Sequence, residues 1–371
     1  MDKRATLRAL AISAFLLTAA MVSLVVFATH NTPCGATPAP PAHAKLMKAI
    51  VLRCYGPPDV LRLENIEKPT PAPNQVLVKV HAASVNPLDW HEMRGTPYVL
   101  MRRNSGFGRP KEFRLGVDYA GTVEAVGTDV KAFKPGDEVF GGRSGSFAQY
   151  VVAREQGTIV HKPPNVSFEQ AGVVNVAGIT ALQALRDWGG IQAGQKVLIN
   201  GASGGVGTFA VQIAKAYGAE VTGVCSTRNV ELVRSIGADH VIDYKKEDFT
   251  EGEVQYDLIV DMAGNHSLLE LRRVLRPDGA GVIVGNAESG HWFGSVVDGL
   301  EADIVTALVS QRFVRMRSDP KKEDMLALRE LMQAGKVVPV IDRRYPLHEL
   351  PAAIEYLETG RARGKVAIKV D

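Results

Sequence analysis

Residues 196–217 read KVLINGASGGVGTFAVQIAKAY, and this stretch decides how the remainder of the sequence is interpreted. The apolar run 197–199 is typical of a buried strand, and residues 208–217 predict an amphipathic helix. Glycines between a strand and a helix let the backbone approach a pyrophosphate, and the start of the helix offers free N–H groups. We therefore expect cofactor phosphates to bind at Gly201, Ala202, Ser203, Gly204, Gly205, Val206 and Gly207.

Strand and helix patterns alternate around this turn. A helical stretch at 169–188 comes first. The following pattern predicts helices at 205–217 and 229–236 and strands at 196–200, 220–225, 241–242, 258–261 and 281–284. Such alternation is typical of a parallel sheet with helices on both faces. The sequence thus predicts an α/β protein with a parallel-sheet domain over residues 171–312.

The residues on either side of this domain have a different pattern. Short apolar or alternating runs are separated by Pro, Gly and Asn, as at 75–82, 121–126 and 145–152. They predict a mostly β, barrel-like domain over residues 47–170. Residues 313–371 contain one strong helical pattern at 322–334 and a final strand at 365–370.

The end of the second strand of the parallel sheet indicates which nicotinamide cofactor binds. An Asp or Glu about 20 residues past the glycines binds the ribose hydroxyls of NAD. Here the strand is followed by hydroxyls and a guanidinium instead of a carboxylate, at Ser226, Thr227 and Arg228. Arg forms charge-assisted hydrogen bonds to phosphate. Tyr244 and Lys245 follow the next strand and are further candidates to contact a 2′-phosphate, so we expect NADPH.

Length, charge and cysteine content limit the possible partners. The chain has 371 residues, which suggests two domains. Its formal net charge of +3 is small for this length, so no nucleic-acid partner is expected. Cys34, Cys54 and Cys225 are widely spaced, which argues against a disulfide framework and against a structural zinc lobe. A small-molecule substrate is the expected partner.

Residues 1–46 differ from the rest of the chain. Three basic residues precede an apolar run at 9–28, which is long enough, at ~1.5 Å per residue, to cross a bilayer core of ~30 Å. A linker rich in Pro, Ala and Thr follows. Three interpretations remain open: an N-terminal membrane tether, a signal peptide cut after residue 44, or translation that starts at Met47.

The localisation also remains open. Basic residues before the apolar run favour an N-terminus inside the cell, which places the following domains outside the cytoplasm, where NADPH is scarce. The protein is membrane-anchored if residues 1–46 are made, and cytoplasmic otherwise.

Residues 47–371 resemble the medium-chain dehydrogenase/reductases of the zinc-free quinone oxidoreductase branch. The stretches that carry the resemblance are MKAIVLRCYG, SVNPLDWHEMRG, LGVDYAGTVEAVG, FKPGDEVFG, GSFAQYVV, AGITALQALRDWGGIQAGQKVLINGASGGVGTFAVQIAKAYGA, GADHVIDY and GRARGKVAIKV. They cover nearly the whole chain after Met47. The subgroup that the chain resembles most includes the reticulon-linked mitochondrial quinone reductase.

The resemblance implies a domain organisation. A GroES-like β-barrel domain spans 47–170, a Rossmann domain that binds NADPH spans 171–312, and residues 313–371 return to the first domain. An N-terminal apolar helix within 1–46 would precede them. The family commonly forms dimers through the Rossmann sheet, so a homodimer is expected.

The resemblance also bears on metal binding. The zinc-dependent branch carries Gly-His-Glu in the segment that here reads LGVDYAG at 115–121, and it has a Cys where this chain has Asn86. A catalytic zinc takes about three His, Cys or carboxylate ligands. Asp118 alone does not make such a set, so no metal is expected.

Several catalytic candidates follow from the resemblance. It places Asn86 near the nicotinamide or the substrate oxygen, and His91 stands where relatives often carry a Tyr. An imidazole at that position is a candidate proton donor, with a packing role as the alternative. Tyr55 and Tyr98 are further candidates to line the substrate pocket.

Three further residues are cofactor candidates. The resemblance places Thr180 beside the nicotinamide, although a hydroxyl within a helix often bonds its own backbone instead. Asn286 follows a strand at the carboxyl end of the sheet, where α/β proteins bind ligands. Lys365 matches a position that contacts the cofactor in relatives.

The expected chemistry follows from the missing metal ligands. Without zinc, alcohol oxidation lacks a Lewis acid. We therefore expect hydride transfer from NADPH to quinones or α,β-unsaturated carbonyls, with the protein supplying orientation, exclusion of water and a hydrogen bond to the developing oxyanion. Two alternatives remain open: an alcohol dehydrogenase of the same superfamily, and a membrane-tethered sensor that binds NADPH without turnover.

Overall fold

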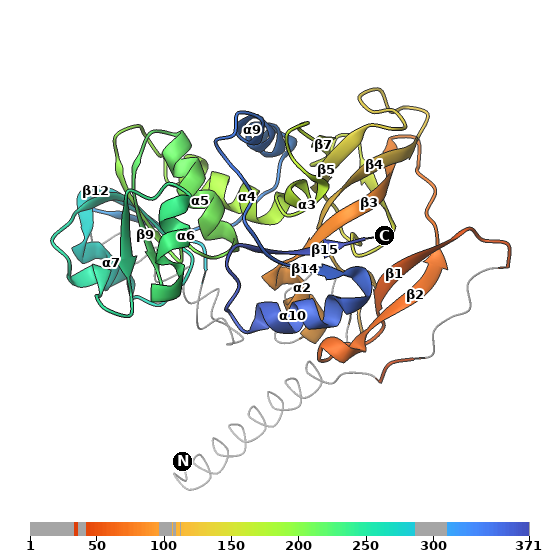
Figure 1. Ribbon diagram of the computed structural model, residues 1–371, viewed down its shortest axis with the longest axis horizontal. Coiled ribbons are helices and arrows are strands. Elements are labelled where there is room, and N and C mark those ends of the chain that lie inside the picture. The colour runs from red at the N-terminus through yellow and green to blue at the C-terminus, as the bar shows by residue number, and fades with distance from the viewer. Residues whose placement is uncertain are drawn as a thin grey trace, which may run out of the picture.

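The computed structural model describes residues 33–35, 42–95, 106, 109–111, 113–285 and 310–370. Two domains lie side by side, the first at the right of Figure 1 and the second at the left. The first is built around a seven-stranded sheet, and the second around a six-stranded sheet whose neighbouring strands are all parallel. This confirms the α/β class and the order of the two domains.

The first domain uses both ends of the described chain. In its larger sheet the strand order is β14-β15-β3-β4-β5-β7, with β6 paired to β3, and β1 and β2 form a separate pair. Its strands are β1 (Leu46–Leu52), β2 (Leu61–Glu67), β3 (Gln75–Val85), β4 (Asp118–Val126), β5 (Glu138–Gly142), β6 (Tyr150–Arg154), β7 (Val160–His161), β14 (Ile341–Pro346) and β15 (Lys365–Lys369). Its helices are η1 (Pro58–Val60), α2 (Pro87–Arg94), α3 (Phe168–Ala171), η6 (Leu347–Glu349) and α10 (Leu350–Glu358).

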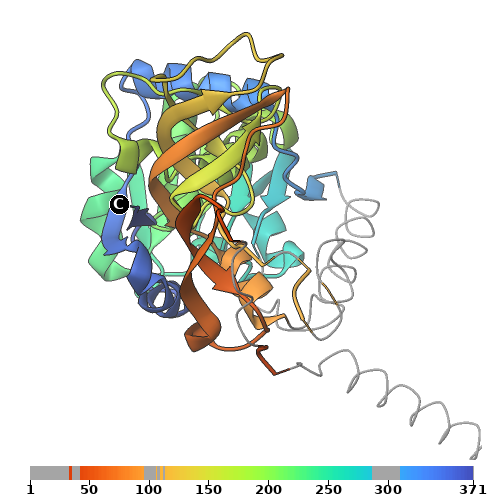
Figure 2. The same cartoon turned by 90° about the vertical axis from the view of Figure 1, so that its right-hand side faces the viewer.

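The last strand completes this domain as the sequence predicted. β15 runs antiparallel to β3, with Val366 opposite Val85. Figure 2, turned by 90°, shows the orange and yellow strands of the first domain in front of the green and cyan second domain. The C-terminal part therefore returns to the first domain after the Rossmann domain has been completed.

The second domain has a doubly wound topology. Its strand order is β10-β9-β8-β11-β12-β13. The chain starts at the central strand β8, adds β9 and β10 on one side of it, and then adds β11, β12 and β13 on the other side. Its strands are β8 (Lys196–Asn200), β9 (Glu220–Cys225), β10 (His240–Asp243), β11 (Tyr256–Asp261), β12 (Leu275–Ile283) and β13 (Arg312–Arg315). In this topology ligands bind at the carboxyl ends of the strands where the order reverses, which here lies between β8 and β11.

Helices pack on this sheet and join it to the first domain. They are α4 (Asn175–Gln183), the π-helical segment η3 (Ala184–Trp188), α5 (Gly205–Ala216), η4 (Thr227–Asn229), α6 (Val230–Ser235), η5 (Phe249–Glu251), α7 (Leu268–Arg273) and α9 (Lys322–Gln333). One core cluster contains Leu182 of α4 and Leu328 of α9 together with Ala120 and Phe140 of the first domain. β13 continues to Arg315, slightly beyond the boundary expected at residue 312.

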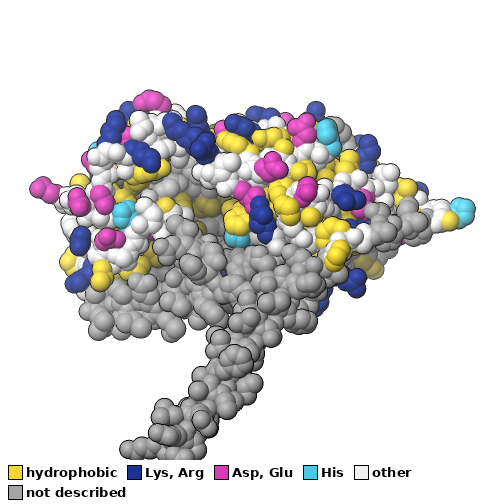
Figure 3. All heavy atoms as spheres, turned by 90° about the horizontal axis from the view of Figure 1, so that it is seen from below, with side chains coloured by type: hydrophobic (Ala, Val, Ile, Leu, Met, Phe, Trp, Pro, Cys, Tyr) yellow, Lys and Arg dark blue, Asp and Glu magenta, His cyan; other side chains and the backbone are white. Residues whose placement is uncertain are grey.

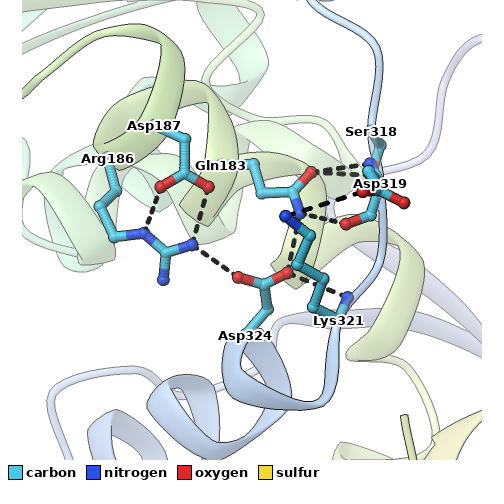
Figure 4. Close-up of polar contacts among 7 residues, drawn as sticks. All are labelled: Gln183, Arg186, Asp187, Ser318, Asp319, Lys321 and Asp324. Atoms are coloured by element: carbon cyan, nitrogen blue, oxygen red, sulfur yellow. Dashed lines mark hydrogen bonds and ion pairs between the residues drawn. The ribbon is translucent and has the colours of Figure 1, made fainter. Parts of the chain in front are cut away.

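The ends of α4 and α9 are tied together by a buried polar cluster (Figure 4). The carboxylate of Asp324, only 1% exposed, accepts hydrogen bonds from Gln183 Nε2 at 2.7 Å, Arg186 Nη2 at 2.6 Å and the backbone N–H of Lys321 at 3.1 Å. Gln183 Nε2 also donates to the carbonyl oxygen of Asp319 at 2.6 Å. This cluster fixes α4 relative to the segment that leads into α9.

Two predicted elements differ from the structure. The strand predicted at 145–152 begins only at Tyr150, because Gly145 has a φ of 91° and the left-handed conformation interrupts an extended strand. The helix predicted at 169–188 is divided, because α3 ends at Gly172 before α4 begins.

The expectation for the cysteines was partly wrong. The structure pairs Cys34 with Cys54 in a disulfide, and their Cα atoms are 4.8 Å apart, a usual separation for such a bond. Cys225 is free and buried. Spacing along the sequence did not predict the pair, because two cysteines 20 residues apart carry no local signal that they meet.

The described residues include no helix with the length and hydrophobicity of a membrane span. The apolar run at 9–28 lies outside the described residues, so the N-terminal helix and the membrane tether stay predictions.

Figure 3 shows the molecule from below, and on the described part of this face Lys and Arg side chains are interspersed with Asp and Glu. A nucleic-acid-binding domain typically has a continuous basic surface instead.

The buried carboxylate of Asp324 provides a test of the α4–α9 cluster. Replacing it with Ala removes the buried carboxylate that Gln183 and Arg186 share, and breaking a buried ion pair in this way costs about 3 kcal/mol. We expect Asp324→Ala to lower the free energy of unfolding by about that amount in urea titrations. Asp187→Ala is the matched control, because Asp187 is 44% exposed in its pair with Arg186 and exposed pairs contribute less than about 1 kcal/mol. Equal losses in the two variants would contradict a structural role for the cluster.

Candidate active site

The glycine-rich turn has the predicted strand–turn–helix geometry. β8 ends at Asn200, and α5 begins at Gly205 with Gly204 as its N-cap. No described side chain caps this helix end. The backbone N–H groups of the first turn are therefore available to a phosphate, which the positive end of the helix favours.

Gly207 shows why this turn requires glycine. A Cβ at this position would lie 2.1 Å from the carbonyl oxygen of Gly201 and 2.8 Å from Cα of Ala202. Any side chain would push α5 away from the turn and from the end of β8. The turn thus fits the cofactor phosphates that the sequence predicted for it.

The turn also contacts the first domain through the residues that precede and begin β15. The backbone N–H of Gly364 donates a hydrogen bond to the carbonyl oxygen of Ser203 at 2.8 Å. A Cβ added to Gly205 would lie 3.2 Å from Cδ of Lys365, so the aliphatic part of Lys365 lies against the start of α5. The Rossmann turn and the last strand of the chain therefore form one site.

Asn229 connects two of the predicted cofactor residues and was missed from the sequence. Its Nδ2 donates to Ser203 Oγ at 2.9 Å and to Ser226 Oγ at 3.2 Å. This side chain joins the phosphate turn to the end of β9. Its position directly after Arg228 was the available signal.

The other residues predicted to bind a 2′-phosphate differ in their surroundings. Arg228 is exposed and donates from Nη2 to the carbonyl oxygen of Arg361 at 2.8 Å. Tyr244 is 51% exposed. Thr227 is exposed as well. Burial acts to raise the pKa of the nearby Asp243 carboxyl, but hydrogen-bond donors around it, Thr227 among them, bring that pKa below its usual value. The contacts of these residues to a 2′-phosphate stay predictions.

Asn86 is held inside the protein by Lys365. Asn86 is 2% exposed, and its Oδ1 accepts a hydrogen bond from Lys365 Nζ at 2.5 Å. Because an ammonium is only a donor, the amide oxygen must face it. The amide nitrogen then donates to Asp118 Oδ2 at 3.1 Å and to the carbonyl oxygen of Ser84 at 3.3 Å. Both amide hydrogens are therefore used within the protein.

Lys365 and Asp118 form a fully buried ion pair, with Nζ 3.5 Å from Oδ2. Their side chains are 4% and 0% exposed. Burial lowers the pKa of Lys365, while the neighbouring carboxyls of Asp118 and Asp89 act in the opposite direction. Asp118 also accepts from Ser84 Oγ at 2.6 Å and from the backbone N–H of Val176, at the start of α4, at 2.9 Å.

Asp89 is a second buried carboxyl near this pair. It accepts hydrogen bonds from the backbone N–H of Asn86 at 2.7 Å and of Gly116 at 3.1 Å. It therefore fixes the start of α2 against the segment before β4. Complete burial raises the pKa of Asp89 from its usual value near 4 to about 8.

The two aromatic catalytic candidates that the structure describes are engaged in packing. The hydroxyl of Tyr55 exchanges 3.1 Å hydrogen bonds with the backbone oxygen and nitrogen of Gly106, and its ring packs on Gly95. His91 stacks on Trp90 with ring centroids 3.5 Å apart. Their roles at the substrate stay predictions.

The remaining candidates are placed as follows. Thr180 is half-buried in α4, and its hydroxyl donates to the carbonyl oxygen of Val176 at 2.7 Å, as expected for a hydroxyl that bonds its own helix. Its hydroxyl oxygen can still accept a hydrogen bond. Tyr98 and Asn286 lie outside the described residues.

Comparison with known proteins now adds to this geometry. Residues 72–165 match the alcohol dehydrogenase GroES-like domain, and residues 236–368 match the zinc-binding dehydrogenase domain. The human NAD(P)H oxidoreductase RTN4IP1, mitochondrial, is 37% identical over 88% of this chain and 89% of its own length. The chain belongs to the quinone oxidoreductase branch of the medium-chain dehydrogenase/reductases.

Solved structures of this branch have the same fold. The quinone oxidoreductase from Coxiella burnetii superposes with a TM-score of 0.76 at 33% identity, covering 88% of this chain and 100% of its own. The Escherichia coli quinone oxidoreductase complexed with NADPH gives a TM-score of 0.73 at 25% identity, covering 87% and 99%. The chain is thus an NAD(P)H-dependent oxidoreductase of the quinone reductase type.

The family also includes zinc enzymes, but this site does not fit a catalytic zinc. The oxygen donors of Asn86 and Asp118 are occupied by the ammonium of Lys365, which would repel a metal cation. An amide and one carboxylate are also fewer than the three ligands that a catalytic zinc takes. Among the described residues no group of three or more His, Cys, Asp or Glu side chains is placed to hold a metal.

The raised pKa of Asp89 predicts how stability depends on pH. The folded state keeps the proton up to about pH 8, whereas the unfolded chain loses it near pH 4. Unfolding therefore releases a proton between these values, and stability falls as the pH rises through that window, by at most about 1.4 kcal/mol per pH unit. Asp89→Asn removes this titration, so the free energy of unfolding of the variant should fall less steeply between pH 5 and pH 8 than that of the wild type. Identical slopes would show that Asp89 is ionised in the folded protein.

Proposed function

We propose that this protein transfers hydride from NADPH to quinones or α,β-unsaturated carbonyl compounds without zinc. The observation that carries this proposal is the buried ammonium of Lys365, which bonds Asn86 and pairs with Asp118 at the positions where zinc-dependent relatives are expected to bind their metal. A site with a fixed organic cation favours reduction of an already activated acceptor over oxidation of an unactivated alcohol.

The preference for NADPH is supported by three observations. The end of β9 presents Ser226 and Arg228 in place of a carboxylate, and Asn229 links Ser226 to the phosphate turn. The Escherichia coli relative was solved with NADPH. Arg228 is exposed and its guanidinium retains donors beyond the one that bonds Arg361. A 2′-phosphate at this position would gain charge-assisted hydrogen bonds.

The chain's own residues orient the reactants. When bound, NADPH supplies the hydride. The start of α5 binds the phosphates, and Val176 of α4 bonds both the Thr180 hydroxyl and the carboxylate of Asp118. The ammonium of Lys365 places positive charge in a water-poor region, which favours an acceptor oxygen that gains negative charge as hydride arrives.

The proposal is tested with the full-length protein in a mild detergent. We expect oxidation of NADPH in the presence of 1,2- or 1,4-quinones and 2-alkenals, at a rate that a metal chelator does not change. Loss of activity with the chelator would support an alcohol dehydrogenase that depends on metal. Tight NADPH binding without turnover for any acceptor would support a non-catalytic sensor.

Arg228 provides the test of cofactor choice. Replacing it with Ala removes a hydrogen bond between charged groups, which contributes about 1.5–3 kcal/mol, or roughly 10- to 150-fold. We expect Arg228→Ala to raise the KM for NADPH by about this factor and to leave the KM for NADH nearly unchanged. Arg234→Ala is the matched control, because Arg234 is exposed on α6 and pairs with Glu231. A loss for both cofactors alike would rule out a contact to the 2′-phosphate.

A further inference from the structure

Asp118 receives donors from four separate parts of the chain. Its Oδ2 accepts from Ser84 Oγ at 2.6 Å and Asn86 Nδ2 at 3.1 Å and lies 3.5 Å from Lys365 Nζ. Its Oδ1 accepts from the backbone N–H of Val176 at 2.9 Å. The carboxylate therefore joins β3, the residue that precedes α2, β15 and the start of α4.

Alternation along β4 places this carboxylate between the domains. Ala120, two residues on, belongs to the core that contains α4 and the Rossmann sheet, whereas Tyr119 belongs to the core of the first domain. Side chains two residues apart lie on the same face of a strand. Asp118 therefore points towards the side where the cofactor domain packs.

The partners of Asp118 lie towards both expected reactants. Lys365 lies with its aliphatic part against the start of α5, where the phosphates are expected. Val176 lies in the first turn of the helix that carries Thr180, and its carbonyl oxygen accepts a hydrogen bond from the Thr180 hydroxyl. Asn86 lies where the substrate oxygen is expected. One buried carboxylate thus fixes the cofactor side and the substrate side relative to each other.

Hydride transfer is sensitive to this relative placement. Reacting atoms must approach to about 3–3.5 Å, and a displacement of about 1 Å costs roughly 100-fold in rate. Removing the negative charge of Asp118 would leave the buried ammonium of Lys365 without its counterion. An amide in place of the carboxylate would also have one acceptor oxygen instead of two, so Lys365 and the N–H of Val176 would compete for it. Helix α4 and Asn86 would then move independently.

We propose that Asp118 is a positioning residue that sets the hydride-transfer distance by holding Asn86, Lys365 and the start of α4 in one hydrogen-bonded cluster. The inference rests on the proposed function. In this proposal Asp118 contacts neither cofactor nor substrate. It acts through Asn86, Lys365 and the start of α4.

The test compares Asp118→Asn with the wild type in the NADPH–quinone assay, using NADPH and NADPH deuterated at the transferred position. We expect kcat to fall by about 100-fold, because the amide keeps the shape but loses the charge and acceptor capacity. The KM for the quinone and the Kd for NADPH should change by less than about threefold, since Asp118 contacts neither. The isotope effect on kcat should rise, because hydride transfer becomes the slowest step.

Asp324→Asn is the matched control. Asp324 is equally buried and binds the other end of α4, through Gln183 and Arg186. It should lower stability and leave the isotope effect unchanged. If Asp118→Asn does not fold, Ser84→Ala removes a single hydrogen bond from the same carboxylate and should lower kcat several-fold, again with a larger isotope effect.

The outcomes separate this inference from the proposed function. The positioning role is overturned, and the proposed function stands, if the wild type turns over but Asp118→Asn has the same kcat and the same isotope effect. The same holds for Ser84→Ala where that variant replaces Asp118→Asn. A loss of NADPH binding in proportion to kcat also overturns it, since that result indicates a merely structural role. Absence of turnover by the wild type with every acceptor overturns both.

Discussion

The buried carboxylate of Asp118 is the interaction on which the site depends. It pairs with the ammonium of Lys365 and accepts hydrogen bonds from Ser84, Asn86 and the backbone of Val176. A buried charge is tolerated only when it is paired and hydrogen-bonded, and this carboxylate meets both conditions. The residues that satisfy it come from both domains, so this carboxylate is one of the contacts that join them.

The ion pair of Lys365 and Asp118 also bears on which cofactors and metals the site can bind. The ammonium occupies the oxygen donors that a metal would need, and its aliphatic part reaches the helix start where phosphates are expected. In the proposed function, cofactor binding and activation of the acceptor meet at the first residue of β15, the strand that pairs with β3.

Local patterns predicted much of this fold. The strand, glycine turn and helix at 196–217 have strong period and turn signals, and the structure confirms them. The strand predicted from residue 145 was wrong at its start, because a left-handed glycine lies inside an apolar run. The disulfide between Cys34 and Cys54 depends on a chain reversal that spacing does not encode.

The strand, turn and helix expected to bind the cofactor phosphates were predictable because they depend on residues that are close in sequence. The other half was only partly predictable. Asn86 and Lys365 were selected through the resemblance, but their direct bond spans 279 positions of the sequence. Asp118 was considered only as a poor metal ligand, since nothing local indicates that an ammonium and a helix start will meet its two oxygens. Asn229 was missed although it directly follows Arg228, because its hydrogen bond to Ser203 spans 26 positions of the sequence.

The most direct test of the account is a crystal structure of the full-length protein with NADPH, grown without added metal. The account predicts the pyrophosphate at the start of α5, the 2′-phosphate within hydrogen-bond distance of Ser226 and Arg228, and the nicotinamide beside the cluster of Asn86, Asp118 and Lys365, whose mutual contacts persist. A metal ion bound by Asn86 and Asp118, or a nicotinamide far from this cluster, would contradict it.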